Sequence, residues 1–293
     1  MHHFLNSVGF KNLKKQEDLD QLLQSIVSSP TSHMVAVDSE GNEYAEFVKE
    51  FGDSMGIMVR GRFMADDTFR IDYYVPYLRG EGVTSEEQIE IQKHSEKESY
   101  AGICDEVRLG VSLIFYLQNT AEYLNERNIF PITKGRENVT LAGLSVNGKI
   151  ILPVNKNEKQ KKNIKKSTQN RNHLIAAARE GDEEAIESLT LEDMDTYSML
   201  SRRIAYEDIL TIVDTCFMPY GIESDQYSVI GEILDYRITK NEQSKEEVYI
   251  MKIDTNGLVY DICINKEDLL GEPEIGRRFK GSIWMQGRIN YVN

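Results

Sequence analysis

The strongest alternation of apolar and polar residues in this chain covers residues 279–292, FKGSIWMQGRINYV. The odd-numbered positions are apolar or glycine and the even-numbered ones are mostly polar, which is the pattern of a long, half-buried β-strand. The exception is Trp284, the chain's only tryptophan, which falls on the polar face between Lys280 and Arg288. We expect the strands that follow Tyr227 to pair with this one.

Three upstream segments alternate in the same way, at 227–239, 247–254 and 258–264. The inward positions expected in the first of them include Ile230, Leu234 and Tyr236. Glycines at 231, 281 and 287 stand where a sheet can bend. The four segments therefore predict a curled sheet or small β-barrel, of the OB or SH3-like kind, over residues 221–293.

The N-terminal part begins with a helical pattern at 14–29 that ends before Pro30, and strands with tight turns follow from Met34 to Leu78. The strands at 57–64 and 69–78 bring their apolar residues to one face only across a loop of odd length. We therefore predict a loop of three or five residues between them.

Two arginines lie on the other face of this predicted hairpin. With a three-residue loop, Arg62 faces Asp72 and Arg60 faces Tyr74. An ion pair and an arginine over a ring are ordinary features of an exposed sheet face. The alternative is that Arg60 and Arg62 form an anion-binding site on that open face.

Residues 79–106 are polar, with a weak helical pattern at 85–95, and are expected to form a long excursion over the surface. The excursion contains the chain's nearest approach to a catalytic cluster, namely His94, Cys104, Asp105 and Glu106. Catalysis would require the histidine to hydrogen-bond the thiol. The alternative is an ordinary loop thiol beside a solvated acidic run.

A central strand at 113–117, a helix at 119–128 and a hairpin with its turn at Asn147-Gly148 complete the predicted N-terminal domain, residues 1–154. We expect it to be an antiparallel β-meander sheet with packing helices. The lysine-rich residues 155–172 contain a single apolar residue and are expected to form a basic linker.

Residues 173–220 form the next predicted segment, a helical hairpin. Gly181 can end one helix, Asp182 can cap the next, and Thr190 with Asp193 resembles a variant capping box. The expected role of these helices is packing and spacing. The whole chain is thus predicted to be an α+β protein.

The net charge of −14 is unevenly distributed. Residues 1–154 carry 15 basic and 23 acidic side chains (−8), residues 155–173 carry 7 and 1 (+6), and residues 174–293 carry 12 and 24 (−12). An acidic bulk repels phosphate backbones, so contact with nucleic acid would have to be local. No apolar stretch reaches membrane-spanning length and the three cysteines form no CxxC pair, so we expect a cytoplasmic protein with no membrane partner.

No phosphate loop, nucleophile elbow, zinc-binding HExxH or dinucleotide fingerprint occurs. No catalytic residue, cofactor or metal is therefore predicted. The leading hypothesis is a non-catalytic interaction or scaffold protein with a protein partner. One alternative is a single-stranded nucleic-acid-binding module that uses Lys280, Trp284, Arg288 and the lysine-rich linker, and the other is an enzyme with a site in residues 79–106. Trp284 could instead pack beneath the helices at 174–217 or beneath the other domain.

The opening MHHFLNSVGF and the run DTYSMLSRRIAYEDILTIVDTCFMPYGIESDQYSVIGEIL give the chain a family resemblance. It is similar throughout to an uncharacterised protein family of clostridial Firmicutes with about this length. The resemblance implies a bacterial, cytoplasmic protein. It supplies no activity, cofactor or site residue.

Overall fold

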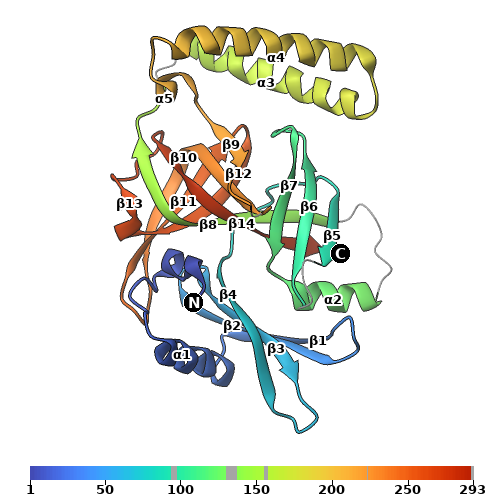
Figure 1. Ribbon diagram of the computed structural model, residues 1–293, viewed down its shortest axis with the longest axis vertical. Helices are drawn as coiled ribbons and strands as arrows, with labels where there is room; N and C mark the ends of the chain where they lie inside the picture. Colours follow the sequence, from blue (N-terminus) through green and yellow to red (C-terminus); the bar gives the residue numbers. More distant parts are fainter. Residues whose placement is uncertain (94–97, 130–136, 155–157, 223, 292–293) are drawn as a thin grey trace.

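The computed structural model describes residues 1–93, 98–129, 137–154, 158–222 and 224–291 (Figure 1). It is a mixed α+β structure with two β-sheets, as the sequence predicts. In the described part of the chain, no helix combines the length and the apolar character needed to cross a membrane.

Sheet A is an antiparallel meander of four strands in the order β1-β2-β3-β4. Its strands are β1 (Ser32–Val37), β2 (Glu43–Gly52), β3 (Met55–Phe63) and β4 (Phe69–Leu78). The 3₁₀-helix η1 (His3–Val8) and α1 (Gln16–Ser28) pack against it, and α1 buries Leu19, Leu22, Leu23 and Ile26. The β3–β4 loop runs from Met64 to Thr68, so the prediction of an odd-length loop is confirmed.

Sheet B contains the other strands. They are β5 (Ile89–Lys93), β6 (Tyr100–Glu106), β7 (Val111–Leu117), β8 (Glu137–Ile151), β9 (Cys216–Pro219), β10 (Gln226–Lys240), β11 (Glu247–Thr255), β12 (Leu258–Asn265), β13 (Leu269–Leu270) and β14 (Arg278–Tyr291). The short η2 (Lys266–Asp268) precedes β13, and α2 (Thr120–Ile129) follows β7.

The strand predicted at 279–292 lies at the centre of this sheet as β14, which pairs with β7, β8 and β10. Both of its faces are buried. Ile283 and Met285 belong to one apolar cluster, inside sheet B, whereas Trp284 belongs to a second cluster between sheet B, sheet A and η1. This strand therefore joins the two cores.

The structure of β8 differs from two predictions. Asn147 and Gly148 lie within it rather than in a hairpin turn, because β8 continues to Ile151 while paired with β14. It also pairs in parallel with β12, so strands from before and after residues 155–172 share one sheet. Most of the predicted linker lies within the helix α3 (Glu158–Arg179), which extends the predicted helical region toward the N-terminus.

Three local predictions are wrong for identifiable reasons. Residues 85–93 carry no helix, because β5 and β6 pair antiparallel in sheet B. Leu234 and Tyr236 are each 38% exposed, because the face of β10 turned toward the inside of sheet B before the β-bulge at Ile233/Asp235 is the odd-numbered one, with Tyr227, Val229 and Ile233. Thr190 caps nothing, because it lies inside the continuous helix α4 (Glu183–Ile204), where its hydroxyl donates to the carbonyl of Ile186.

Candidate interaction surface

Trp284 is only 6% exposed, beneath the N-terminal end of the chain. Its ring lies 5.0 Å from that of His2, 5.3 Å from that of Phe4 and 5.2 Å from that of Tyr116, measured between centroids. Its indole N–H donates to Oδ2 of Asp225 at 2.7 Å. The ring is thus enclosed by η1 and sheet B, and not by the helices at 174–217.

The two cations predicted to flank Trp284 have different surroundings. Arg288 donates to the carboxylate of Glu122 in α2 at 2.8 Å. Lys280 is half-buried near the start of β14, where it is paired with Lys149 of β8 and Ile230 of β10. The three residues share a strand face, but they do not present a free aromatic ring between two free cations.

Arg60 is fully buried between the two sheets, not on an open face. Its guanidinium donates to Glu46 at 2.7 Å, to the Tyr116 hydroxyl at 2.6 Å and to the carbonyl of Gln118. The five-residue loop and a register shift between Arg60 and Gly61 together set it opposite Tyr73, whereas the three-residue loop considered above would set it opposite Tyr74. A buried arginine with this many partners joins sheet A to sheet B.

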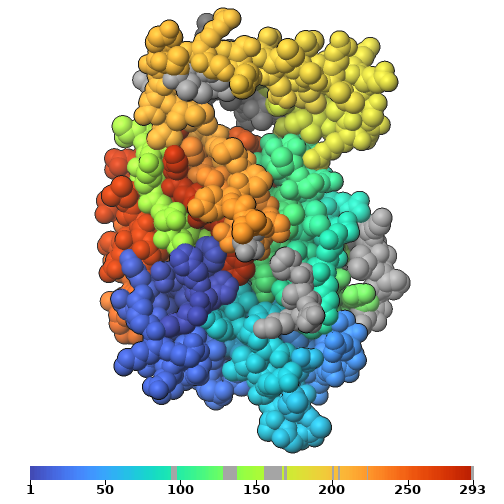
Figure 2. All heavy atoms as spheres, viewed as in Figure 1, coloured from blue at the N-terminus to red at the C-terminus, as the bar shows by residue number. Residues whose placement is uncertain are grey.

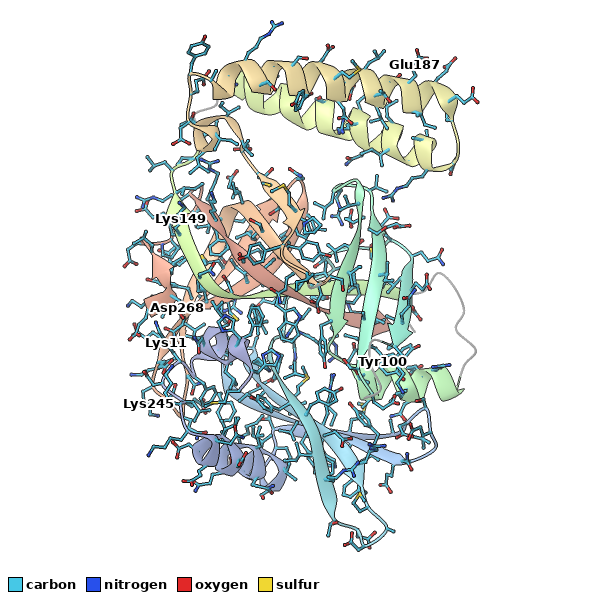
Figure 3. All side chains as sticks on the ribbon, in the orientation of Figure 1. Lys11, Tyr100, Lys149, Glu187, Lys245 and Asp268 are labelled. Carbon is cyan, nitrogen blue, oxygen red and sulfur yellow. The ribbon has the colours of Figure 1, made fainter. Side chains whose placement is uncertain are left out.

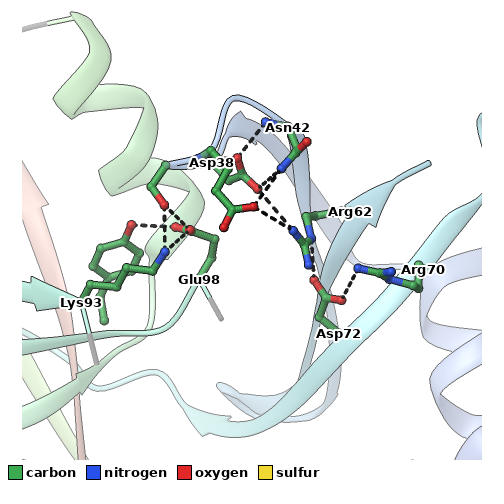
Figure 4. A network of polar contacts seen from close by, with 10 residues as sticks. Asp38, Asn42, Arg62, Arg70, Asp72, Lys93 and Glu98 are labelled. Carbon is green, nitrogen blue, oxygen red and sulfur yellow. Dashed lines mark hydrogen bonds and ion pairs between the residues drawn. The ribbon is translucent and has the colours of Figure 1, made fainter. Parts of the chain in front are cut away.

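Arg62 lies in a polar network at the end of sheet A (Figure 4). The predicted ion pair with Asp72 is present at 3.0 Å, although the strand pairing sets Arg62 opposite Arg70 and not opposite Asp72. Glu40 at 3.5 Å and Asp38 at 4.0 Å lie on its other side. Arg70 also contacts Asp72 at 3.4 Å. Because acidic side chains surround it, Arg62 has its charge compensated within the chain.

Glu98, in the same polar network, connects the two sheets (Figure 4). Its carboxylate accepts hydrogen bonds from Lys93, Ser39 and Tyr100, each at 2.6 Å. Burial by itself would raise the pKa of Glu98, but these hydrogen bonds hold it below its ordinary value. The β1–β2 turn is thereby attached to β5 and β6.

The predicted catalytic cluster around Cys104 is not assembled, because its β6 residues lie on opposite faces of the strand: Cys104 and Glu106 are buried and Asp105 is exposed. Cys104 is 1% exposed, and burial raises the pKa of its thiol to about 11. Burial would also raise the pKa of Glu106, but two hydrogen bonds from Arg108 keep it lowered. Asp105 points to the exposed face, where it accepts from Ser112. His94 lies outside the described residues, and within them no group of three or more His, Cys, Asp or Glu side chains could hold a metal ion.

The helical hairpin is the most prominent surface feature. Its turn follows from local sequence: Gly181 has a φ of +92°, and the Asp182 carboxylate accepts the Ala185 N–H at the start of α4. Arg171 in α3 contacts Asp193 of α4 at 2.7 Å and Glu192 at 3.5 Å. The two helices are therefore antiparallel neighbours.

The hairpin lies across one end of the molecule, with α4 on the side away from sheet B (Figure 1). Near its turn, Arg179 donates to the main-chain oxygen of Asp105 at 2.9 Å, and Ile175 lies against Gly110. At its other end it continues through α5 (Ile209–Ile212) to β9. Figure 2 shows an opening between the helices and the body of the molecule. A cleft of about 660 Å³ lies at the attachment near the turn, where Gly110, Ile175 and Arg179 are among its lining residues.

The outer helix α4 leaves apolar side chains in solvent. We call four of them the α4 stripe: Ile186 (47% exposed), Leu191 (58%), Met194 (62%) and Tyr197 (75%). Every residue from Leu191 to Met199 is exposed. Glu187, beside the stripe, also projects away from the body of the molecule (Figure 3).

The sequence contained this signal, but we interpreted it as packing. Ile186, Met194 and Tyr197 recur at helical spacing, the usual pattern of a face turned toward a core. Periodicity predicts a buried face, yet it does not distinguish burial within the chain from burial against a partner.

Comparison with known proteins gives one family and no activity. No curated protein matches the sequence, and no solved structure matches the fold. Residues 5–287 match the model of a family described as "Domain of unknown function, E. rectale Gene description (DUF3881)". This finding confirms the resemblance to an uncharacterised clostridial family. Since the match covers almost all of the 293 residues, the chain belongs to this family of unknown function.

Proposed function

We propose that this chain is a non-catalytic protein-interaction protein and that the α4 stripe is the surface that receives its partner. The observation that carries the proposal is a helix with no buried residue over nine consecutive positions, Leu191–Met199, three of which carry stripe side chains. Helices in globular proteins gain most of their stability by packing an apolar face. An unpacked apolar face is therefore typical of a surface that becomes buried in a complex.

The composition of the stripe supports this role. Tyrosine and methionine are enriched in the buried centres of protein interfaces, whereas glutamate and lysine are depleted there. The stripe contains Met194 and Tyr197, and acidic residues such as Glu187 lie beside it. An apolar centre with a charged border suits a protein partner better than a phosphate backbone.

The other two functions considered have less support. Nucleic-acid stacking at Trp284 requires a free ring face, and this ring is enclosed by His2, Phe4 and Tyr116. A thiol nucleophile at Cys104 requires a lowered pKa, and burial has the opposite effect on it. Both hypotheses remain predictions without a specific observation in their favour.

The test is photo-crosslinking in the native cell with a matched pair of positions. A benzophenone amino acid replaces Met194, which is in the stripe, or Met199, which is 57% exposed on another side of α4. We expect a strong protein adduct from position 194 and little from position 199. Equal yields at both positions, or no adduct at either, would contradict the proposal.

We also propose a finer description of the architecture. Strands β8, β12, β11, β10 and β14 pair in succession, and β14 pairs again with β8, which supports a small barrel made of four C-terminal strands and β8. Sheet A with α1 and η1 forms a second, N-terminal unit. Hydrogen exchange that protects these five strands as one cooperative unit would support this division, and separate protection of β8 would contradict it.

A further inference from the structure

The helical hairpin differs from the rest of the chain in its charge. Residues 158–204 carry nine basic and nine acidic side chains, a net charge of zero. Since the whole chain carries −14, the remaining residues carry all of that charge. Two copies of a strongly acidic protein repel each other over most of their surface. The hairpin is the part where this repulsion is absent.

Within the hairpin the charges are separated along its length. The Arg171–Asp193 pair sets the register, so residues 158–171 of α3 lie beside the C-terminal part of α4. At the end of α4 away from the turn, residues 196–204 carry two basic side chains, Arg202 and Arg203, or +2. Residues 183–195 of α4, next to the turn, carry six acidic and no basic side chains, or −6.

This distribution is complementary to itself when reversed. In an antiparallel contact between two α4 helices, the +2 end of each lies beside the −6 end of the other. A parallel contact would set like charges together. A two-fold axis generates the antiparallel arrangement, in which the same surface is used on both copies.

The α4 stripe is placed to fill the centre of such a contact. The midpoint of Glu183–Ile204 falls between Asp193 and Met194, so Met194 would lie next to the axis. Because α4 is the helix away from sheet B (Figure 1), two copies could meet there with their bodies pointing in opposite directions.

We propose that the partner bound by the α4 stripe is a second copy of this chain, joined antiparallel through α4 about a two-fold axis near Met194. The inference rests on the proposed function and names its partner. The basic and acidic ends set the orientation, and the stripe supplies the apolar area that is buried.

The first experiment measures the mass of the purified full-length chain by sedimentation against concentration. We expect a particle of twice the 33.6 kDa chain mass, with weaker association at high salt. Met194→Glu should raise the dissociation constant about 10-fold or more, since it introduces a charge at the interface centre. Met199→Glu, the same change at similar exposure away from the stripe, should leave it within about 2-fold.

The second experiment tests the orientation by disulfide formation, with half-buried Cys216 replaced by serine in both variants. In the antiparallel pair, Met194→Cys meets its own copy. Ile186→Cys lies about 22 Å from its copy, at 1.5 Å per residue, which is too far for a disulfide. We expect a covalent dimer from the first variant only.

Other outcomes overturn the inference. Disulfides from both variants would mean a parallel contact, and a dimer insensitive to Met194→Glu would mean a contact elsewhere. A chain that stays monomeric at all concentrations would exclude the second copy. Adducts of another protein at position 194 in the cell would then retain the proposed function, whereas their absence would remove it too.

Discussion

Arg171 of α3 and Asp193 of α4 form an ion pair of 2.7 Å between the two long helices, and this contact shows how the two helices are aligned. Both side chains are partly exposed, so the pair contributes about 0–1 kcal/mol to stability. Its importance is geometric. It defines a hairpin in which the charges are separated by position and the apolar stripe lies at the middle.

The buried arginine between the sheets should dominate the stability of their contact. Arg60→Met leaves the Glu46 carboxylate buried without its partner and should lower the free energy of unfolding by about 3–5 kcal/mol. Urea denaturation followed by circular dichroism measures this. Arg62→Met, at the partly exposed network, serves as the control and should cost about 1 kcal/mol or less.

A double variant distinguishes the loss of the ion pair from a general failure to fold. Arg60→Met with Glu46→Leu removes both charges and should recover much of the lost stability, because no unpaired charge remains. A double variant no more stable than Arg60→Met would contradict the ion-pair account.

All indole fluorescence from this protein reports on Trp284. Because the ring is enclosed, we expect a blue-shifted emission maximum, weak quenching by acrylamide and no response to single-stranded RNA or DNA. A red-shifted emission that oligonucleotides quench in a salt-dependent way would instead show that Trp284 is exposed and binds nucleic acid.

Stability should depend on pH through His2. Burial beside Trp284, with smaller effects from His3 and the terminal ammonium, lowers the pKa of His2 from 6.5 to about 4. Between these values the unfolded chain binds more protons, so stability falls as pH is lowered from 6.5 to 4, by up to roughly 3 kcal/mol.

Urea titrations across that pH window would check this dependence. His2→Gln should remove this part of the decline, whereas His33→Gln, at an exposed position, should not. If the wild type and His2→Gln decline in parallel, His2 is not responsible.

Gly148 is needed for a close approach rather than for a turn. A Cβ built on it would overlap the ring of Phe279 in β14. Gly148→Ala should therefore cost about 1–3 kcal/mol by overpacking. Phe279→Leu should relieve part of this cost, which a double-mutant cycle in urea would detect as coupling. Strictly additive effects would argue against the contact.

Local pattern was sufficient for much of the fold. The stripe of Leu19, Leu22, Leu23 and Ile26 predicted α1, and the alternation around Ile283 and Met285 predicted β14. The face requirement of β3 and β4 even predicted the parity of their loop. Each of these depends on residues adjacent in sequence, for which side-chain period carries the information.

Other features depended on contacts between distant segments. The sequence Asn147-Gly148 is typical of a hairpin turn, and only the pairing of β8 with β14 shows that the strand continues through it. The parallel pairing of β8 with β12 joins residues about 120 positions apart in the sequence. The bulge after Ile233 cannot be predicted from the alternation of apolar and polar residues. The candidate site was missed because the spacing of Met194 and Tyr197 is the same whether the face packs inside the chain or against a partner.

The most direct measurement of the central claim is the oxidation rate of Met194 relative to Met199. Both side chains are similarly exposed in the isolated chain, at 62% and 57%, and they lie on different sides of one helix. Peroxide is applied to the dilute purified protein and to cells that contain it, and sulfoxide is quantified at each position by mass spectrometry. We predict that Met194 is protected in cells while Met199 reacts at an unchanged relative rate. Equal reactivity of the two methionines in both settings would contradict the assignment of the α4 stripe as an interaction surface.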